Sequence, residues 1–356
     1  MNKKTIITIT GIRPDFIRMS QVFKRLDEDN NINHILIHSG QHYDNLLSDV
    51  FFKDLNIRQP DYNLNIGKTC NNHYEQQAAL GPAVISTIQS NNLNPDLILF
   101  LGDSNSVLAS VPLKKEGYKI GHIEAGMRSY DMRMLEEINR KVCDHVSDLF
   151  FVYHKDYKQN LLNEGIAENK IFIVGNTVVE PLTNIADLNQ NQENCHILLD
   201  IHRPENFKYS ERLKLILEFS NICSTRFNLP VKLLNFSRTT NVVYDKKIDL
   251  KNISLINLMG YKDFVKLMQD SLFIISDSGT AQEEPALLGI PVIVPRDFTE
   301  RPQSVDSNCS IMLPVEDRNE WDRCINWINS EPNLNTNWLG DGNASYEILD
   351  IIKQKI

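Results

Sequence analysis

The chain has 356 residues, of which 42% are hydrophobic and 23% charged, so it can form two domains with full cores and is not a disordered chain. Its 37 basic and 46 acidic residues give a formal net charge of −9, an acidic balance that argues against a nucleic-acid-binding protein. An anionic ligand stays compatible with this charge, because a few arginines can hold a phosphate on an acidic protein.

The N-terminal segment, MNKKTIITITGIRPDF, contains an apolar run that is short and β-branched and ends in Gly-Ile-Arg-Pro. A signal peptide needs a longer apolar run and a small-residue cleavage site, so we expect none here. We also expect no membrane span, because the sequence has no run of about 18 apolar residues. The six cysteines are scattered without a CxxC pair, which predicts reduced thiols in a cytoplasmic protein.

Short apolar runs alternate with segments of helical period along the first half of the chain. The predicted strands are residues 5–10, 34–38, 97–101, 149–152 and 171–174, and the predicted helices are residues 16–26, 43–55 and 136–146. The run at 97–101 (LILFL) is wholly apolar, as is typical of a strand buried on both faces. This β-α-β alternation predicts an α/β fold, with a parallel sheet covered by helices on both faces.

The same pattern restarts after a polar linker at residues 186–194. The predicted strands are residues 196–200, 231–234, 253–258, 272–276 and 291–294, and the predicted helices are residues 210–223, 261–269, 279–288, 321–329 and 345–356. We therefore expect two doubly wound units with a junction between about residues 174 and 194. Such units leave a cleft, and ligands bind beyond the carboxyl ends of the strands.

Two polar clusters follow predicted strands in the first half. Gly-Ile-Arg-Pro at 11–14 is a glycine turn before a helix, which suits an anion, and Arg13 and Arg18 add positive charge there. Asp103 follows the LILFL strand and is a candidate catalytic carboxylate. The alternative for Asp103 is a helix N-cap, because Asp and Ser are favoured at that position.

A third cluster, GHIEAG at 121–126 followed by EEINR at 136–140, brings more carboxylates. Glu124 ends a predicted strand among small and apolar neighbours, where a surface position fits poorly, and Glu136 opens a helix near Arg140. Glu137 fits a surface position well. Carboxylates that converge on a cleft can divide into acid and base if their surroundings separate their pKa values.

A fourth cluster, DSGTAQEE at 277–284, follows the strand LFIIS and opens a predicted helix. Ser278, Gly279 and Thr280 offer backbone N–H groups and hydroxyls at a helix N-terminus, the geometry of a phosphate cradle. A carboxylate in the next turn can accept both hydroxyls of a ribose. We expect no metal, because none of the nine histidines has zinc-ligand spacing. His202 ends the predicted strand after the linker, and Arg301 follows a further loop.

Taken together, these motifs resemble the non-hydrolysing UDP-N-acetylglucosamine 2-epimerase family. The motifs that carry the resemblance are GIRPDFIR (11–18), SGQHYD (39–44), GDSNS (102–106), HIEAGMRS (122–129), EEINR (136–140), GNTVVE (175–180), HRPENF (202–207), DSGTAQEE (277–284) and ERP (300–302). They run in the family's order over nearly the whole chain.

The resemblance implies a GT-B fold, in which two Rossmann-like doubly wound parallel-sheet domains face a cleft that binds a UDP-sugar. It implies an N-terminal domain at residues 1–175, onto which the C-terminal helix 342–356 packs back, and a UDP-binding domain at 176–341. The implied chemistry is anti elimination of UDP to a 2-acetamidoglycal, followed by re-addition at the opposite face of C2. The resemblance implies a homodimer, and it implies no cofactor and no metal.

The resemblance also implies roles for individual residues. Asp103, Glu124 and Glu136 would be the catalytic acid and base groups around C2 and the departing UDP oxygen. The implied contacts to the UDP-sugar come from both halves of the chain: Arg13, Arg18, Arg140, His202, Arg238, Phe264, Ser278, Gly279, Thr280, Glu284 and Arg301. Among them, Glu284 would take the ribose hydroxyls, and Phe264 lies where the family has a uracil contact.

The chain departs from the family pattern in places that bear on the substrate. A loop that usually contains His reads Asn-Phe-Ser-Arg-Thr at 235–239, so Phe236 stands at that histidine's place and Arg238 is the substitute cation. The usual Lys of the first loop is Arg18. Some features, such as NRKVCDH at 139–145, are similar to the subfamily that acts on UDP-2-acetamido-2,6-dideoxy-L-hexoses, whereas SGQHYD is similar to the UDP-GlcNAc enzymes.

The substrate therefore stays open between these two classes, with the enzyme supplying a surface glycan precursor. Three alternative functions also remain: a hydrolysing 2-epimerase that releases free ManNAc, a GT-B glycosyltransferase that needs an acceptor, and an inactive UDP-sugar-binding protein.

Overall fold

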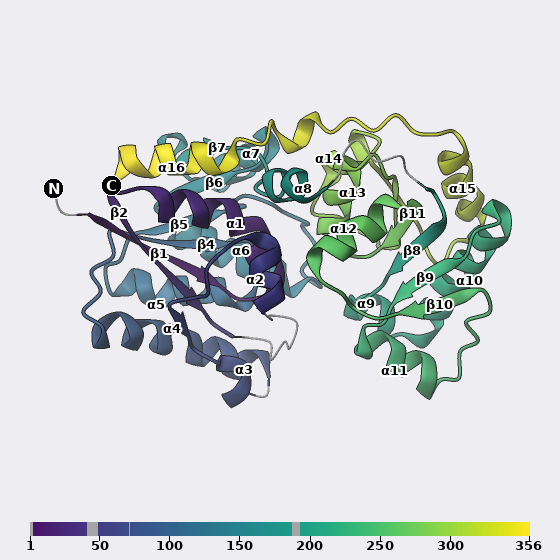
Figure 1. Cartoon of the computed structure of the whole chain (residues 1–356), viewed down its shortest axis with the longest axis horizontal. Coiled ribbons are helices and arrows are strands. Elements are labelled where there is room, and N and C mark those ends of the chain that lie inside the picture. The colour runs from purple at the N-terminus through teal and green to yellow at the C-terminus, as the bar shows by residue number, and fades with distance from the viewer. Residues whose placement is uncertain (1–2, 41–48, 71, 187–192) are drawn as a thin grey trace. The chain divides into compact units, whose positions relative to one another are not determined.

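The computed structural model describes residues 3–40, 49–70, 72–186 and 193–356. The chain forms two compact units, one from Met1–Pro181 with Leu339–Ile356 and the other from Leu182–Trp338. Part of the predicted helix 43–55, residues 41–44 of the SGQHYD motif and most of the predicted linker 186–194 lie outside the described residues. Each unit is an α/β layer structure around one sheet (Figure 1).

The first unit contains a seven-stranded sheet in the order β3-β2-β1-β4-β5-β6-β7, in which every pairing is parallel. Its strands are β1 (Lys4–Thr10), β2 (Ile32–His38), β3 (Tyr62–Asn63), β4 (Leu97–Leu101), β5 (Ile120–Ile123), β6 (Leu149–Val152) and β7 (Ile171–Ile173). The bounds of β4 and β6 are those predicted from the sequence, which confirms the parallel α/β interpretation of this half.

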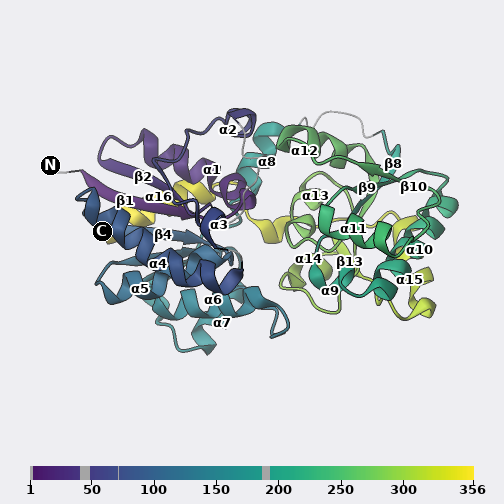
Figure 2. The ribbon, with the colours of Figure 1, turned by 90° about the horizontal axis from the view of Figure 1, so that it is seen from below.

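Helices cover both faces of this sheet. They are α1 (Arg13–Glu28), α2 (Asp49–Leu55), α3 (Ile66–Thr69), α4 (His73–Ser90), α5 (Ser110–Lys115), α6 (Leu135–Val146), α7 (Lys155–Asn163), α8 (Val179–Ile185, which spans the unit boundary) and α16 (Ala344–Lys355), with short 3₁₀ turns η1 (Asn105–Ala109) and η2 (Glu168–Lys170). Helices α4, α5 and α6 form one layer (Figure 2). Two alternate residues of β1, Ile7 and Ile9, belong to the same buried apolar cluster as Leu80 and Val84 of α4.

Helix α4 is the long element that the sequence did not predict. It contains Pro82 and Gly81, which usually interrupt a helix, and few large apolar residues mark its period. Gly81 allows close approach to α5, since a Cβ at this position would clash with the ring of Pro112. Tertiary packing thus determines the helical structure of this segment, because its local sequence signals for a helix are weak.

The C-terminal helix α16 returns to the first unit and packs on α1 (Figure 1). The Arg25 guanidinium lies 3.9 Å from the centre of the Tyr346 ring, and the buried Glu180 carboxylate accepts hydrogen bonds from the Ser345 N–H (2.8 Å) and hydroxyl (2.5 Å). These contacts join the end of the chain to the segment just before residue 182.

The second unit contains a six-stranded, wholly parallel sheet in the order β10-β9-β8-β11-β12-β13. Its strands are β8 (His196–Asp200), β9 (Val231–Leu234), β10 (Ile253–Ile256), β11 (Ser271–Ser276), β12 (Val292–Val294) and β13 (Ser310–Met312). Its helices are α9 (Pro204–Phe207), α10 (Ser210–Phe227), α11 (Ser237–Asp245), α12 (Tyr261–Gln269), α13 (Glu284–Leu287), α14 (Pro302–Asp306) and α15 (Trp321–Asn329), with 3₁₀ turns η3 (Thr280–Gln282), η4 (Arg318–Glu320) and η5 (Asn337–Leu339).

The helix predicted over residues 279–288 is wrong as a single element. The structure has the three-residue turn η3 and then the four-residue helix α13, with Glu283 between them at φ −114° and ψ −61°. Pro285 explains the break, because proline has no N–H to donate to the carbonyl oxygen of Ala281, four residues before it. Within the described ranges, no helix combines the length and apolar character needed to cross a bilayer.

Candidate active site

In the first unit, predicted site residues follow the carboxyl ends of three strands. Arg13 and Arg18 lie on α1 directly after β1, Asp103 follows β4, and Glu124 follows β5. Because β1, β4 and β5 are neighbours in a parallel sheet, these ends meet at one edge, where ligands bind in such folds. The sheet order thus brings together charges that are far apart in the sequence.

A buried ion pair joins α1 to the loop after β5. The Arg18 guanidinium contacts the Glu124 carboxylate, and the two side chains are 7% and 1% exposed. Glu124 has a φ of +69°, a left-handed conformation that is uncommon for a residue with a side chain and persists only where its surroundings fix it. A Cβ built on Gly102 would lie 3.5 Å from Glu124 Oε1, so the loop after β4 passes close to this carboxylate.

Helix α6 supports the loop that carries Asp103. The Arg140 guanidinium pairs with the Asp103 carboxylate, and Asn139 Nδ2 donates to the Asp103 carbonyl oxygen at 2.8 Å. Arg140 is buried, whereas the Asp103 side chain is 23% exposed. The pair therefore leaves Asp103 accessible to a ligand and keeps its charge partner in the core.

The two adjacent glutamates of α6 differ in burial, and the structure corrects the prediction for one of them. The surface interpretation of Glu137 is wrong: its side chain is buried and accepts hydrogen bonds from the Ser129 N–H at 2.8 Å and hydroxyl at 3.0 Å. Glu136 is half-buried in the first turn of α6, one turn before Arg140. Helical geometry explains the difference, because neighbouring residues on a helix point about 100° apart.

A buried histidine behind the Asp103 and Glu124 loops was not predicted as a site residue. His122 Nδ1 lies 2.7 Å from Asp144 Oδ1, and Nε2 lies 2.8 Å from the Gly102 carbonyl oxygen, so both nitrogens face acceptors. Although burial disfavours the charged ring, the Cys143 sulfur and the Asp144 carboxylate hold the pKa of His122 well above its usual value. Asp144 also accepts the Gly126 N–H at 3.1 Å, so this pair fixes both loops.

Asp15 closes the glycine turn after β1. One oxygen of its carboxylate accepts the N–H groups of Gly11 (2.6 Å) and Ile12 (3.1 Å). Burial raises the pKa of Asp15 to about 6, although those two hydrogen bonds and Arg18 act against the rise. The turn predicted to suit an anion thus already contains a buried acid, which accepts the two N–H groups at the start of that turn.

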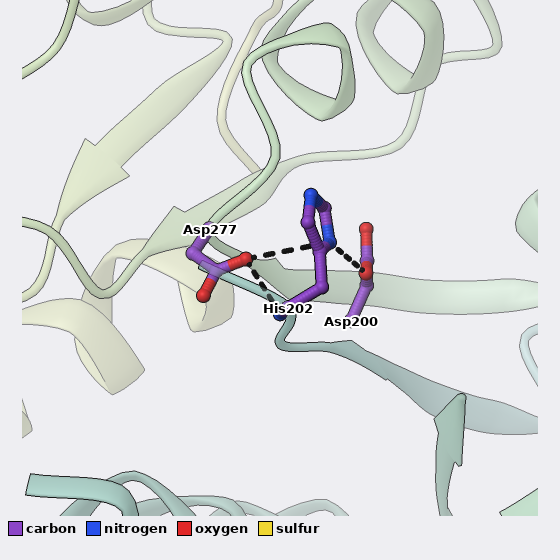
Figure 3. A group of neighbouring side chains, drawn as sticks. All are labelled: Asp200, His202 and Asp277. Carbon is purple, nitrogen blue, oxygen red and sulfur yellow. Dashed lines mark hydrogen bonds and ion pairs between the residues drawn. The ribbon is translucent and has the colours of Figure 1, made fainter. Parts of the chain in front are cut away.

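In the second unit, predicted residues again follow the carboxyl ends of adjacent strands, here β8, β11 and β12. Figure 3 shows the His202 ring between Asp200, at the end of β8, and Asp277, after β11. His202 Nδ1 lies 2.9 Å from Asp200 Oδ1 and 3.6 Å from Asp277 Oδ1. Neither carboxylate was predicted as a site residue, because in the sequence each is a single polar residue at the end of an apolar strand.

Among the described residues, this trio is the one group of acidic and histidine side chains whose ligand atoms lie within 4.8 Å of one another. Hydrogen bonds account for its geometry. Asp277 accepts the N–H groups of His202 (3.0 Å) and Arg203 (3.0 Å) and Asn206 Nδ2 (2.9 Å), so its oxygens already face donors. We therefore describe the group as a hydrogen-bonded histidine and do not assign it as a metal site.

The loop after β11 contains the residues predicted to cradle a phosphate. The Ser278 and Thr280 hydroxyls are 3.1 Å apart, and both side chains are partly exposed. Because η3 has three residues, the argument from the dipole of a long helix does not hold, and hydroxyls and backbone N–H groups are the donors available. A Cβ at Gly279 would meet the Arg301 guanidinium and lie 2.7 Å from Glu300 Oε1, so a side chain here would displace this buried ion pair.

Arg301 lies behind that loop. Its Nε is 2.7 Å from Glu283 Oε1, and one terminal nitrogen is 2.7 Å from Glu300 Oε1. The guanidinium is 3% exposed and its charge is balanced by two buried carboxylates. The Arg301 guanidinium is therefore buried directly against Gly279, and its predicted contact with the UDP-sugar stays a prediction.

A tyrosine that was not predicted as a site residue connects one predicted nucleoside contact, Glu284, to the helix that carries another, Phe264. The Tyr261 hydroxyl donates to Glu284 Oε1 at 2.5 Å, and both residues are buried. Phe264 lies on the same helix, α12, three residues after Tyr261, and is half-buried. Arg238 is exposed in the first turn of α11, and the ring of Phe236 just before it packs 5.0 Å from that of His202.

Comparison with known proteins identifies the family. The family model described as UDP-N-acetylglucosamine 2-epimerase matches residues 24–353. The UDP-N-acetylglucosamine 2-epimerase of Methanococcus maripaludis is 34% identical over 97% of each chain. The UDP-2,3-diacetamido-2,3-dideoxy-D-glucuronate 2-epimerase of Pseudomonas aeruginosa is also 34% identical, over 86% of this chain and 88% of its own.

A solved structure extends the likeness to the fold. The Methanocaldococcus jannaschii UDP-GlcNAc 2-epimerase in complex with UDP-GlcNAc and UDP superposes with a TM-score of 0.87 at 32% identity, covering 98% of this chain and 99% of that one. With two all-parallel α/β units, this likeness shows the GT-B fold. The matched model and the full-length relatives lead to one conclusion: the chain belongs to the UDP-N-acetylglucosamine 2-epimerase family.

Proposed function

We propose that this chain is a non-hydrolysing 2-epimerase of a UDP-N-acetylhexosamine. The observation that carries the proposal is the pair of carboxylates, Asp103 and Glu124, at one edge of the first sheet. Each carboxylate pairs with a buried arginine. The chain also belongs to the epimerase family. One such carboxylate can take the proton from C2 of the sugar, and another group can assist departure of UDP from C1.

The proposed reaction is redox-neutral and conserves every atom. A base removes the C2 proton as the C1–O bond to UDP breaks, which gives a 2-acetamidoglycal and UDP. UDP then adds back to C1, and a proton is delivered to the opposite face of C2. Because no hydride or electron leaves the substrate, the route needs no nicotinamide, and no metal is assigned a part in it.

In this proposal, Asp103, Glu124 and Glu136 supply the acid and base groups, and the arginines of the first unit stabilise negative charge. The half-buried position of Glu136, one turn before Arg140, is compatible with a role near the same edge. Arg13 would face the developing charge on UDP, and the buried Arg18 and Arg140 would add positive charge through their pairs with Glu124 and Asp103. Electrostatic stabilisation of such a leaving group is usually the largest single contribution to the rate.

We assign the nucleotide to the second unit. Ser278, Gly279 and Thr280 would bind the diphosphate, with His202 and Arg238 as nearby cations and Arg301 supporting the loop from behind. Glu284 would accept the ribose hydroxyls while the Tyr261 hydroxyl fixes it, and Phe264 would contact the uracil. Residues 1–175 with 342–356 would thus form the sugar side, and residues 176–341 the UDP side.

The sugar itself is proposed as a class. UDP-GlcNAc and a UDP-2-acetamido-2,6-dideoxy-L-hexose both fit the sequence motifs, and the relatives include an enzyme named for a diacetamido sugar.

We also propose a cytoplasmic homodimer that supplies precursors for surface glycans. Light scattering with size-exclusion chromatography measures the oligomeric state, and a monomer of 40.9 kDa would contradict the dimer.

Incubation of the purified protein with UDP-GlcNAc, a UDP-6-deoxy-L-HexNAc and a UDP-diacetamido-glucuronate tests the function. We expect interconversion of the C2 epimers, with the mass of the UDP-sugar unchanged. Free N-acetylmannosamine with UDP would instead identify a hydrolysing enzyme, and turnover that requires an acceptor would identify a glycosyltransferase. Binding of UDP without turnover of any of these sugars would indicate a binding protein.

A further inference from the structure

Asp200 and Asp277 both face His202, but their hydrogen bonds differ. The Asp277 oxygens accept two backbone N–H groups and Asn206 Nδ2, so this carboxylate shapes the turn between β8 and α9. Asp200 accepts from His202 Nδ1 at 2.9 Å and from the Ser276 hydroxyl at 2.9 Å. The hydrogen-bond donors to the Asp200 carboxylate are thus both side chains, whereas two of the donors to Asp277 are backbone N–H groups.

A continuous chain of hydrogen bonds runs through Asp200. The Ser278 N–H donates to Ser276 Oγ at 3.0 Å, the Ser276 hydroxyl donates to Asp200 Oδ2, and His202 Nδ1 donates to Asp200 Oδ1. Asp200 is buried, so water does not screen these contacts. The chain connects the His202 ring to the backbone of the Ser278 loop, although the two residues follow different strands.

The charges around His202 come from three elements. Asp200 lies at the end of β8, Asp277 follows β11, Arg203 precedes α9, and the uncharged ring of Phe236 packs 5.0 Å away. Burial opposes a charge on the ring, but Asp200 and Asp277 outweigh both burial and Arg203, so the pKa of His202 lies above its usual value. Figure 3 shows Nε2 pointing away from both carboxylates.

We propose that Asp200 is a positioning residue, which holds His202 as an imidazolium with Nε2–H directed at a phosphoryl oxygen and sets the Ser278 loop for the same anion. This inference rests on the proposed function, because the anion is the diphosphate of a UDP-sugar. Asp200 touches no substrate in this account; it acts through His202 and, by way of Ser276, through Ser278. A charged donor is stronger than a neutral one, so loss of the orientation lowers affinity.

A double-mutant cycle with UDP as the probe tests whether Asp200 acts through His202. Asp200→Asn should weaken UDP binding about tenfold at pH 7, measured by calorimetry, because one charge-assisted contact loses its support. In the His202→Gln background the same change should have an effect of less than about twofold, since coupled residues are not additive. Equal losses in both backgrounds would overturn the proposal.

Two further variants separate orientation from folding. Ser276→Ala removes the link to Ser278 and leaves the contact with His202, so it should lower affinity for UDP less than Asp200→Asn does. Asp317→Asn is the matched control, because the Asp317 side chain caps η4 in the same unit by accepting the Asn319 N–H at 3.1 Å. An equal loss of UDP affinity in Asp317→Asn and Asp200→Asn would also contradict the positioning role.

Protonation of His202 is measurable without any substrate. In ¹⁵N-histidine-labelled protein, with the His202 signals assigned by their loss in His202→Gln, the midpoint of titration should lie above 6.5 and fall in Asp200→Asn. An unchanged midpoint would overturn the proposal even if the enzyme is an epimerase. If no UDP-sugar is turned over, the proposed function fails while this titration still decides the role of Asp200. Activity lost to a chelator and restored by Zn²⁺ would instead make the trio a metal site.

Discussion

The Arg18 guanidinium and the Glu124 carboxylate form an ion pair inside the first unit, with side chains 7% and 1% exposed. The pair joins α1, which follows β1, to the loop after β5, where Glu124 has a left-handed backbone. The residue proposed as a catalytic carboxylate is therefore also a structural partner. Both the folding and the turnover of variants at this position therefore have to be measured.

Glu124→Gln should destabilise the protein by about 3–5 kcal/mol, because it leaves the buried Arg18 charge without its partner. The double variant Arg18→Gln with Glu124→Gln should lose less than Glu124→Gln alone, since neither side chain then carries a charge. Urea unfolding followed by circular dichroism measures both. A double variant that loses the sum of the two single effects would show that the pair is not coupled.

Asp103→Asn should lower kcat by about 10²–10⁴-fold, the range typical of a lost acid or base group, while the affinity for UDP changes little. The control is Asp148→Asn, at the other end of the same sheet, where the carboxylate accepts the Ile120 N–H at 2.9 Å. The control should keep its turnover. Near-normal turnover in both Asp103→Asn and a folded Glu124→Gln would refute their catalytic assignment.

Asp15 should make the free energy of unfolding depend on pH. Burial raises the pKa of Asp15 from 3.8 to about 6, so the folded state holds the proton more tightly than the unfolded state does between these values. The contribution of Asp15 to the free energy of unfolding therefore falls by about 3 kcal/mol as the pH rises from about 4 to about 6. It is smallest above that window.

Asp15→Asn tests this dependence, because an amide oxygen can still accept the N–H groups of Gly11 and Ile12. The difference in unfolding free energy, wild type minus variant, should decrease from pH 4 to pH 6 and stay constant above. A difference that is the same at pH 4, 6 and 7.5 would show that this carboxyl titrates normally in the folded protein.

Gly340→Ala should destabilise the first unit more than Gly117→Ala does. Both glycines have a φ of +90°, where a side chain costs about 1–2 kcal/mol. A Cβ at Gly340 would lie 2.9 Å from the Gly175 Cα, whereas a Cβ at Gly117 would have no atom of the described structure within 4 Å. Thermal unfolding of the two variants compares strain alone with strain plus a clash, and equal midpoints would contradict the tight packing of residues 175 and 340.

The sequence predicted the strands and helices with strong, well-bounded apolar patterns. β4, β8 and α12 have the predicted bounds, because an apolar run or an amphipathic period ends at a polar or glycine-containing turn in each case. It missed α4, whose small residues and Pro82 give a weak period, and it merged η3 with α13 because the effect of Pro285 was not taken into account.

The site could be predicted in part. Charged residues such as Asp103 and Glu124 were predicted to follow the carboxyl ends of strands, where the structure has them, because strand ends are visible in the sequence and parallel sheets gather them at one edge. The partners of His202 and Glu284 were not predicted, because the contact of Asp200 with His202, or of Tyr261 with Glu284, depends on strand order and helix rotation. Local periodicity does not encode either property.

The measurement that tests the central claim most directly is a proton NMR time course of the enzyme with UDP-GlcNAc and the UDP-6-deoxy-L-HexNAc substrates in heavy water. The elimination and re-addition route predicts deuterium at C2 in both epimers of one of these sugars, with the sugar still joined to UDP. A folded protein that binds UDP but exchanges no C2 proton of any UDP-N-acetylhexosamine supplied would contradict it.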